Sequence, residues 1–376
     1  MAIIVKQVTT RKELKTFALY DQQLYKGNPF FVPALQSDEI DLLDEKKNPA
    51  FDFCEAAYFL AYRDGQIVGR IAAILNKRSN ERWHENNVRF GFVDFIDDIE
   101  VSQALFEQVE QWARSKNVDK VHGPLGFTDM DKEGLLIEGF DQLATMSALY
   151  NAPYYRTHIE RLGYKKEVDW LEFKISVPEQ VPEKHLRIAK IAQEKYALRV
   201  LKYTSSSRIA REYGQAIFRL VNKAYGSLYG YVPLTQRQID FYIRAYLPVL
   251  NLKFVTLIVD RNNDLIGLGI AMPSLSVALQ KSGGKLFPLG FLHLLKALRG
   301  KTTKVVDLLL VAIKPEYQNK GVNALLFSDL IPQFIAAGVE YAESNPELEI
   351  NGKVQAQWDY FETINHKRRR AYSKTL

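Results

Sequence analysis

One β-hairpin pattern occurs in both halves of this chain, and it constrains the fold more than any other feature. The first copy, YFLAYRDGQIVGRIAAIL at 58–75, has two apolar, β-rich runs on either side of Asp-Gly, a dipeptide typical of tight hairpin turns. The second copy, FVTLIVDRNNDLIGLGIAM at 254–272, has the same two runs around a longer turn. In both copies a glycine follows the first two apolar residues of the second run, namely Gly69 and Gly267. The chain therefore encodes two similar antiparallel units.

The elements around the two hairpins follow one order. Helical segments precede each hairpin, and an apolar strand follows it, at 88–96 and 304–313. Each of these strands leads into an amphipathic helix (VSQALFEQVEQWARSK and VNALLFSDLIPQFIAAG) and then into a further strand (VDKVHG and VEYAES). An aromatic-rich segment that we interpret as a closing helix comes last, APYYRTHIERLGY in the first half and QWDYFETINHKRRRAY in the second. This order predicts two copies of one mixed α/β domain, each with a central, mostly antiparallel mixed sheet flanked by helices.

A proline-containing segment separates the two units. With 376 residues the chain is too long for one ordinary hydrophobic core. Neither a helix nor a central strand continues through SVPEQVPE at 176–183, and a helical pattern follows it. We therefore predict a first domain at 1–175, a linker and linker helix at 176–197, and a second domain at 198–376 that carries an insertion at 274–304.

The composition is that of a globular protein without a metal or disulfide framework. Hydrophobic residues make up 47% and charged residues 25% of the chain, and no run of eighteen apolar residues occurs. Cys54 is the single cysteine, has no histidine or cysteine neighbours at metal-ligand spacing, and is expected to be a buried small hydrophobe. The N-terminal segment lacks the pattern of a signal peptide, so a cytoplasmic location is expected. The net charge of +6 favours anionic ligands without requiring nucleic acid.

The junction at 314–324 has the features of an anion site. Pro315 ends the strand, and Gly321 permits a tight turn that leaves the first amides of the next helix uncovered. Free N–H groups at the positive end of a helix dipole suit a phosphate, and Lys320 adds charge. The alternative is that the loop only connects a strand to a helix.

This junction resembles that of the GNAT acyltransferases (GCN5-related N-acetyltransferases), in which a strand ending in V/IxP leads to R/QxxGxG/A and a helix. The resemblance implies two tandem GNAT-like domains with the coenzyme motif only in the second, and implies that the loop amides bind the diphosphate of acetyl-CoA or another acyl-CoA. Asn323 departs from the small residue usual in the family. The residues expected along the pantetheine arm are Val311, Ala312 and Ile313, and those expected around the diphosphate are Gln318, Asn319, Lys320, Gly321, Val322, Asn323 and Ala324.

A second match to the family, the pattern ExxxSN, lies in VEYAESNPE at 339–347. By resemblance Glu340 is a general base that takes a proton from the attacking amine, and Asn345 contacts the coenzyme. An ammonium must lose a proton before it can attack a thioester, and a carboxylate with a suitable pKa can accept it. Glu343 and Asp307 are alternatives for the base.

The proton donor to the leaving thiolate is, in the family, a tyrosine on the closing helix within FYExxGF. Here the segment reads DYFETINH, so tyrosine and phenylalanine are exchanged. Tyr360 is the expected donor and Tyr372 the alternative. The tail HKRRR at 366–370 is interpreted as a solvated helix end, with contact to nucleic acid or to the coenzyme's phosphates as the alternatives.

The first half lacks the glycine-containing junction. Its counterpart, FIDDIEVSQALF, has no glycine and carries Asp97, Asp98 and Glu100 where a diphosphate would lie. Acids suit a helix N-terminus but repel a coenzyme A diphosphate. We therefore expect the first half to be a degenerate copy that serves as scaffold or as one wall of the substrate cleft.

The insertion pairs an apolar helix, FPLGFLHLLKALRG, with lysines and arginine at its end. It is interpreted as a lid helix packed on the other domain, with a membrane-surface helix and an acyl-chain tunnel as alternatives.

The sequence thus predicts a GNAT-type N-acyltransferase that moves an acyl group, expected to be acetyl, directly from coenzyme A to an unidentified amine. The alternatives are a non-catalytic acyl-CoA-binding or interaction protein and a long-chain N-acyltransferase that uses the insertion. The expected partner is a small-molecule or peptide amine, and the sequence is also compatible with a homodimer. No metal, nucleic acid or membrane span is expected.

Overall fold

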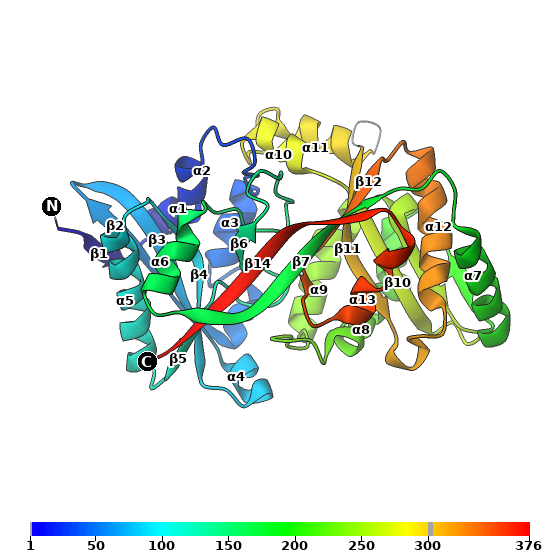
Figure 1. Ribbon diagram of the computed structural model, residues 1–376, viewed down its shortest axis with the longest axis horizontal. Helices are drawn as coiled ribbons and strands as arrows, with labels where there is room; N and C mark the ends of the chain where they lie inside the picture. The colour runs from blue at the N-terminus through cyan, green and yellow to red at the C-terminus, as the bar shows by residue number, and fades with distance from the viewer. Residues whose placement is uncertain (1, 300–303) are drawn as a thin grey trace.

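One continuous sheet of fourteen strands runs through both halves of the molecule in the computed structural model, which describes residues 2–299 and 304–376 (Figure 1). The strand order is β1-β2-β3-β4-β5-β14-β7-β12-β11-β10-β9-β8, with β6 beside β14 and β13 beside β7. Most neighbours are antiparallel, whereas β4–β5 and β11–β12 are parallel. The predicted mixed α/β class is confirmed.

The elements of the first half are β1 (Ile4–Gln7), α1 (Arg11–Ala18), α2 (Tyr20–Leu24), α3 (Gln36–Leu43), η1 (Pro49–Asp52), β2 (Cys54–Arg63), β3 (Gln66–Asn76), α4 (Lys77–Trp83), β4 (Asn87–Phe95), α5 (Ile99–Ser115), β5 (Lys120–Gly123), β6 (Leu135–Glu138), α6 (Tyr154–Arg161) and β7 (Lys165–Ser176).

Those of the second half are α7 (Glu183–Tyr196), β8 (Arg199–Leu201), α8 (Ser206–Tyr225), α9 (Gln236–Tyr246), η2 (Leu247–Val249), η3 (Leu252–Phe254), β9 (Val255–Val259), β10 (Leu265–Pro273), α10 (Ser276–Ser282), α11 (Gly290–Leu298), β11 (Val305–Ile313), η4 (Pro315–Tyr317), α12 (Val322–Ala336), β12 (Tyr341–Ser344), β13 (Glu347–Leu348), α13 (Gly352–Gln355), η5 (Trp358–Tyr360) and β14 (Thr363–Thr375).

Both predicted hairpins form, as β2–β3 and β9–β10. In the first, Asp64 and Gly65 have φ of 52° and 77°, the left-handed conformation that a tight hairpin turn requires. The predicted strands and helices that follow each hairpin also form, as β4, α5 and β5 in one half and β11, α12 and β12 in the other. The repeated order of elements is therefore present up to this point.

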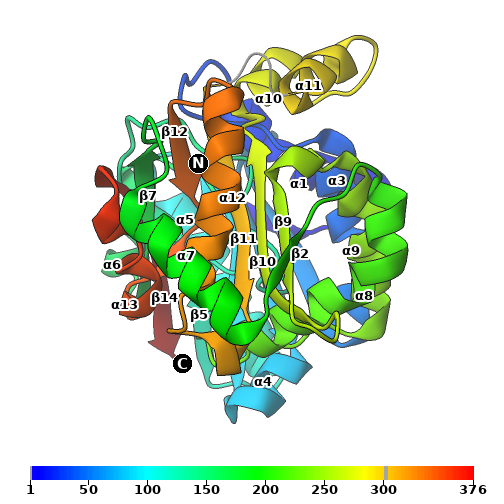
Figure 2. The same ribbon diagram turned by 90° about the vertical axis from the view of Figure 1, so that its right-hand side faces the viewer.

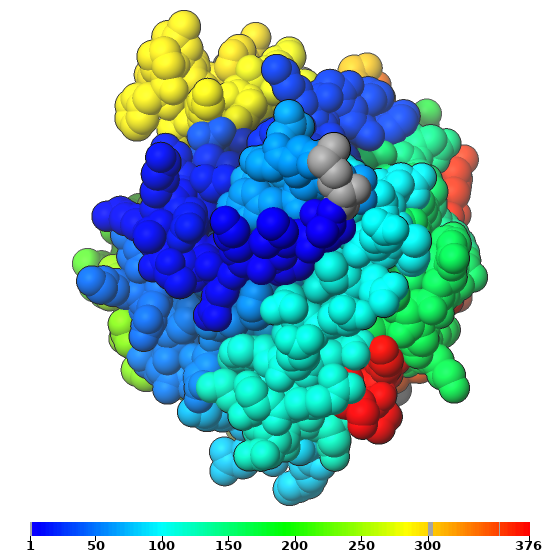
Figure 3. Space-filling model, turned by 90° about the vertical axis from the view of Figure 1, so that its left-hand side faces the viewer, coloured from blue at the N-terminus to red at the C-terminus, as the bar shows by residue number. Residues whose placement is uncertain are grey.

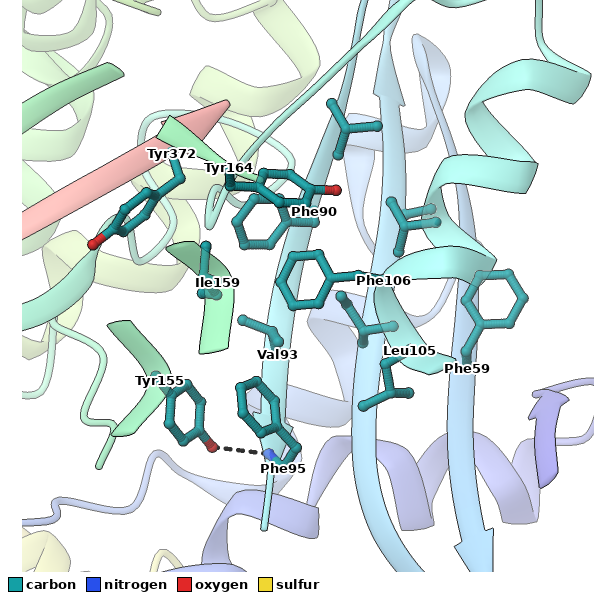
Figure 4. Packing of buried hydrophobic residues seen from close by; sticks show 14 of the residues in the cluster. Phe59, Phe90, Val93, Phe95, Leu105, Phe106, Tyr155, Ile159, Tyr164 and Tyr372 are labelled. Atoms are coloured by element: carbon teal, nitrogen blue, oxygen red, sulfur yellow. Dashed lines mark hydrogen bonds between the residues drawn. The ribbon is translucent and has the colours of Figure 1, made fainter. Parts of the chain in front are cut away.

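The two halves exchange their last strands. β7, from the first half, pairs with β12 of the second half, and β14, from the end of the chain, pairs with β5 of the first half. β7 and β14 also pair with each other in the middle of the sheet, where they cross the molecule together (Figure 1). Tyr372 of β14 is fully buried among aromatic side chains of the first half, near Tyr164 and Phe90 (Figure 4). Residues 363–375 thus complete the sheet of the first half. The predicted division of the chain into two domains, with a linker at 176–197, stays a prediction.

The prediction of a closing helix over 357–372 is wrong, because this segment forms the short turn η5 and then the strand β14. The prediction that HKRRR is a solvated helix end is wrong for the same reason. Lys367, Arg369 and Ala371 are at most 1% exposed, and they alternate with less buried neighbours as the period of a strand requires.

Acids on neighbouring strands compensate the buried cations of β14. Arg369 binds Glu172 of β7, and Lys367 binds both Glu172 and Glu343 of β12. Burial acts to raise the pKa of Glu172, but Arg369 and Lys367 outweigh it and hold that pKa below its usual range. The main-chain carbonyls of Leu143 and Leu149 accept further hydrogen bonds from Lys367 and Arg369. A fold tolerates buried charges of this kind only when each charge lies beside one of opposite sign.

Within the described residues, no helix combines the length and the apolar character needed to cross a bilayer.

Arg369→Met tests the central ion pairs. Removing one partner of a buried pair leaves Glu172 poorly compensated, so the free energy of unfolding falls by roughly 3 kcal/mol, with Lys367 limiting the loss. Urea denaturation measures it. Arg211→Met is the control, because that side chain is 77% exposed and its loss costs less than about 1 kcal/mol. Equal stability of the two variants would contradict the structural importance of this cluster.

Candidate functional site

A fork opens in the sheet where β11 and β12 separate. Their parallel pairing ends at Leu308 and Ser344, whereas β11 continues to Ile313. The carbonyl of Leu309, beyond the last pair, accepts a hydrogen bond of 2.7 Å from Nδ2 of Asn345. Oδ1 of Asn345 accepts in turn from Ser147 Oγ of the first half at 3.0 Å. Asn345, one of the predicted coenzyme contacts, therefore lies at the root of the fork.

The predicted anion loop leads from this fork to α12. Ile313 ends β11, and Gln318 folds back to donate to the Ile313 carbonyl at 3.3 Å. Asn319 and Gly321 have φ of 59° and 79°, so both residues adopt the left-handed conformation needed for the turn. Among the described residues no side chain caps the N-terminus of α12, and the amide of Ala324 donates to the Gly321 carbonyl at 3.1 Å. The amides of Val322 and Asn323 are therefore left for another acceptor. Lys320 is exposed beside this terminus, 5.4 Å from the Tyr317 ring.

The structure gives Gly321 and Asn323 roles that the sequence did not indicate. A Cβ on Gly321 would lie 2.6 Å from Cγ2 of Ile188, because α7 packs against the start of α12 (Figure 2). Glycine is thus needed for helix packing as well as for the turn. Asn323 is helical, at the second position of α12, so it needs no unusual backbone angle. Its place in the first helical turn is compatible with an anion there.

The corresponding helix of the first half has its own acceptor at the N-terminus. Asp98 caps α5 by accepting from the amide of Glu100 at 2.9 Å and also binds Arg63 at 2.7 Å. Asp97 contacts His158 at 3.0 Å. The acids of this junction therefore have a structural role.

An apolar cavity of about 40 Å³ lies between α12 and the strands of the fork. Leu308, Val311 and Ala342 contribute the strand side. Leu326, Phe327, Leu330, Ile331 and Phe334 contribute the helix side, and Trp358 and Phe361 line another wall.

A buried polar cluster occupies the root of the fork. Asp307 of β11 lies in register with Glu343 of β12 and is 1% exposed. No donor in the described part of the chain reaches either oxygen of Asp307 with normal hydrogen-bond geometry. Burial and the neighbouring Glu343 carboxylate raise the pKa of Asp307 to about 7, although the nearby Ser274 hydroxyl and the Lys367 charge act to lower it. Glu343 itself binds Lys367 and lies 3.2 Å from His366 Nε2. A buried carboxylate with this pKa can exchange a proton near neutral pH.

The structure separates Glu340 from these groups. Glu340 comes before β12, at the end opposite the fork, and binds Lys304 with 58% of its side chain exposed. It stays a predicted base, but the structure does not bring it to the fork.

Neither predicted tyrosine lies on a helix that closes the site. Tyr360 is 49% exposed in η5 and contacts Lys184, 4.3 Å from its ring. Tyr372 is buried in the first half, 3.3 Å from Glu160.

Two groups at the fork were not predicted. The hydroxyl of Tyr225, at the end of α8, donates to the Val311 carbonyl at 3.0 Å, and burial raises the pKa of Tyr225 to about 12. Burial raises the pKa of Glu347 to about 8, although the Trp358 indole, at 3.0 Å, counteracts the rise. Tyr225 lies in KAYGSLYGY, where nothing distinguishes it from its neighbouring tyrosines. Glu347 belongs to VEYAESNPE. Its position two residues after Asn345, a predicted coenzyme contact, was the signal that could have indicated it.

Cys54 is buried at 5% exposure, as expected, and burial raises its pKa to about 12, which keeps the thiol protonated.

These residues fit an acyl-CoA. The uncapped terminus of α12 with Lys320 suits a diphosphate, and the apolar walls of the fork suit the chain that follows it.

Comparison with known proteins agrees with this geometry. No family model matches the chain. A solved structure described as a tandem GNAT protein from the clavulanic acid biosynthesis pathway superposes with a TM-score of 0.55 at 12% identity, covering 100% of this chain and 98% of that one. This chain has the tandem GNAT fold. The resemblance proposed from the loop and ExxxSN motifs is thereby confirmed at the level of the fold.

Two sequence relatives are similar to this tandem GNAT chain over most of its length. "Protein YghO" of Escherichia coli (strain K12) is 27% identical over 377 residues, covering 99% of this chain and 95% of the relative. "Bacterial ceramide synthase" of Caulobacter vibrioides (strain NA1000 / CB15N) is 27% identical over 320 residues, covering 85% and 82%.

Asp307→Asn tests the unusual environment of Asp307. Because its pKa is raised in the folded protein, folding binds a proton at intermediate pH, and stability is lost as the pH rises from about 4 to about 7. The variant lacks this loss, so relative to the unmutated protein it gains stability over that range, reaching roughly 2–4 kcal/mol above pH 7.

Urea denaturation at a series of pH values measures the difference. Asp359→Asn removes an exposed carboxylate and serves as the control, with a change within about 0.5 kcal/mol. A pH-independent difference for Asp307→Asn would contradict the assigned environment.

Proposed function

We propose that this tandem GNAT chain is an acyl-CoA-dependent N-acyltransferase whose second half binds the thioester and transfers its acyl group directly to an amine. The observation that carries the proposal is the buried Asp307, whose pKa is raised to about 7, at the root of a fork whose other end leads to the N-terminus of α12. The fold supports an acyltransferase, because many members of this fold catalyse acyl transfer. As an enzyme that uses acyl-CoA, it is proposed to act in the cytoplasm.

The donor is held by backbone groups. In this proposal the amides around Gln318 to Ala324 bind the diphosphate, and the β11 edge at Val311 to Ile313 lies along the pantetheine arm. Asn345 and Tyr225 already bind the carbonyls of Leu309 and Val311 on this strand. These side chains occupy positions along the fork side of β11, where a pantetheine arm would have to replace or share their hydrogen bonds.

Asp307 is the proposed base, with Glu343 and Lys367 fixing its environment. The amine loses its proton to the carboxylate and attacks the thioester carbonyl, forming the amide bond as the carbon–sulfur bond breaks. The released thiolate takes a proton from a donor at the fork. Tyr225 is the proposed donor, because its hydroxyl keeps its proton at neutral pH and already donates toward this strand.

A long-chain donor is the second candidate, and the apolar character of the fork walls favours it. The cavity of about 40 Å³ between these walls is far smaller than a fatty acyl chain, so a long chain requires the fork to open. One relative is named a bacterial ceramide synthase, and a ceramide is the amide of a fatty acid with a long-chain amine. This similarity supports amide formation and makes a lipid amine a candidate acceptor beside small molecules and peptides.

Asn323→Asp tests donor binding without disturbing the fold. The exchange is nearly isosteric, and an acid in the first turn of a helix is favourable, so thermal stability stays equal or rises. The added charge faces the proposed diphosphate, so the affinity for CoA and acetyl-CoA falls by roughly tenfold or more. Isothermal calorimetry with CoA, acetyl-CoA and palmitoyl-CoA measures binding and ranks the chain lengths.

Gln111→Glu, on the exposed face of α5, makes the same charge change in the first half and is expected to leave binding unchanged. A protein that binds none of the three thiols and thioesters would refute the proposed function.

Asp307→Asn also tests the base. Its kcat, followed as thiol release across a panel of small, peptide and long-chain amines, falls by about 100-fold or more, whereas donor affinity changes little. Glu340→Gln is the matched control and is expected to retain activity, because Glu340 is exposed away from the fork. The reverse pattern would restore Glu340 as the base. Binding without thiol release from any amine would favour the non-catalytic alternative.

A further inference from the structure

The insertion between β10 and β11 has one face packed on the first half. Ala278, Leu279 and Leu294 form an apolar cluster with Val32 and Ala144 of the first half. Ser276 Oγ donates to the Ala144 carbonyl at 2.9 Å. The interpretation of the insertion as a helix packed on the other domain is confirmed for this inner face. Residues 300–303 of the predicted insertion lie outside the described residues.

The outer face of the insertion carries large apolar side chains in solvent. Phe287 is 77% exposed, Leu289 63%, Leu292 51% and Leu295 45%, and Val277 on α10 is 51% exposed. They lie on α10, α11 and the turn between them, which project from one side of the molecule, near the middle of its long axis (Figures 1, 2 and 3). Soluble surfaces rarely expose so many large apolar side chains within one short segment. The outer face therefore has the character of an interaction surface.

The charges of the insertion have a single sign. No aspartate or glutamate occurs among residues 274–304. Lys281, Lys285 and Arg299 are exposed around the apolar side chains. An apolar face whose own charged side chains are all cations matches the headgroup region of an anionic bilayer, where apolar side chains enter the acyl boundary and cations meet lipid phosphates.

We propose that this outer face, formed by Val277, Phe287, Leu289, Leu292 and Leu295 with Lys281, Lys285 and Arg299, docks the protein onto the surface of an anionic membrane. The charge pattern favours a lipid surface over a second copy of the chain, because two copies of this face would oppose cations to cations. The inference does not depend on the proposed chemistry.

The inner face of the insertion contacts the same first-half loop that reaches the fork. Ala144 accepts from Ser276, while Leu143 and Ser147 of this loop contact Lys367 and Asn345. Membrane docking would thus place the bilayer on the side of the loop that covers the polar cluster.

Vesicle co-sedimentation of the full chain, without any acyl donor, tests the docking surface. The protein is expected to bind vesicles of phosphatidylcholine with phosphatidylglycerol, to bind pure phosphatidylcholine weakly, and to lose binding at high salt. Phe287→Ser/Leu289→Ser/Leu292→Ser is expected to lower partitioning onto the anionic vesicles at least tenfold. Lys281→Gln/Lys285→Gln/Arg299→Gln is expected to remove the preference for anionic lipid.

Matched triple variants control for exposure and charge. Ile4→Ser/Ile191→Ser/Ile350→Ser removes apolar side chains that are 56%, 55% and 76% exposed elsewhere and is expected to bind as the unmutated protein does. Lys12→Gln/Lys46→Gln/Lys190→Gln removes three exposed cations elsewhere and is likewise expected to bind normally. Thermal melts confirm that all variants fold.

Three results would overturn the inference. They are absence of binding to anionic vesicles, full binding by the Phe287→Ser/Leu289→Ser/Leu292→Ser variant, and a dimer in sedimentation velocity that this variant dissociates while vesicle binding is unchanged. Because no donor or amine is present, failure here leaves the proposed acyl transfer intact, and failure of acyl transfer leaves this surface intact.

Discussion

The antiparallel pairing of β7 with β14 is the constraint on which the rest of the structure depends. It joins two sheets into one, and it brings Lys367 and Arg369 from the end of the chain beside Glu172 and Glu343. These charges are removed from water, so their energetic cost is acceptable only while the two strands keep their register. The same register places Lys367 beside the carboxylates of the fork. The site therefore depends on the joint between the halves as much as on its own strands.

The two junctions that begin α5 and α12 show how one architecture serves two purposes. In the first half Asp98 supplies the acceptor that the helix amides need, and Arg63 fixes the carboxylate. In the second half glycine replaces the capping residue, and no side chain of the described residues caps the helix terminus. A helix that lacks its own acceptor is less stable alone but can bind an anion. The contrast within one chain explains why only the second half is proposed to hold the donor.

The sequence predicted the local elements and missed the long-range ones. The hairpins, α12 and its loop were readable because turn residues and apolar periodicity are local signals. β14 was mistaken for a helix because a run of four cations, KRRR, is typical of a solvent-exposed segment. Its burial depends on Glu172 and Glu343, which compensate the cations but lie on other strands, so no local pattern indicates the pairing. Glu340 matched a family pattern, yet it precedes β12 and therefore lies at the end of that strand opposite the fork. Asp307 was named only as an alternative, since its burial beside Glu343 is a property of the assembled sheet. Tyr225 carried no local signal.

The exchange of last strands also makes each half incomplete without the other. A nick in the segment between β7 and α7 would leave two fragments that still share a sheet, each filling a gap in its counterpart. Loss of the first half would expose an unpaired edge at β12, and loss of the second would expose one at β5, and bare strand edges invite aggregation. The first half therefore has a structural role in the fold: it contributes β7 to the sheet of the second half and receives β14 from it.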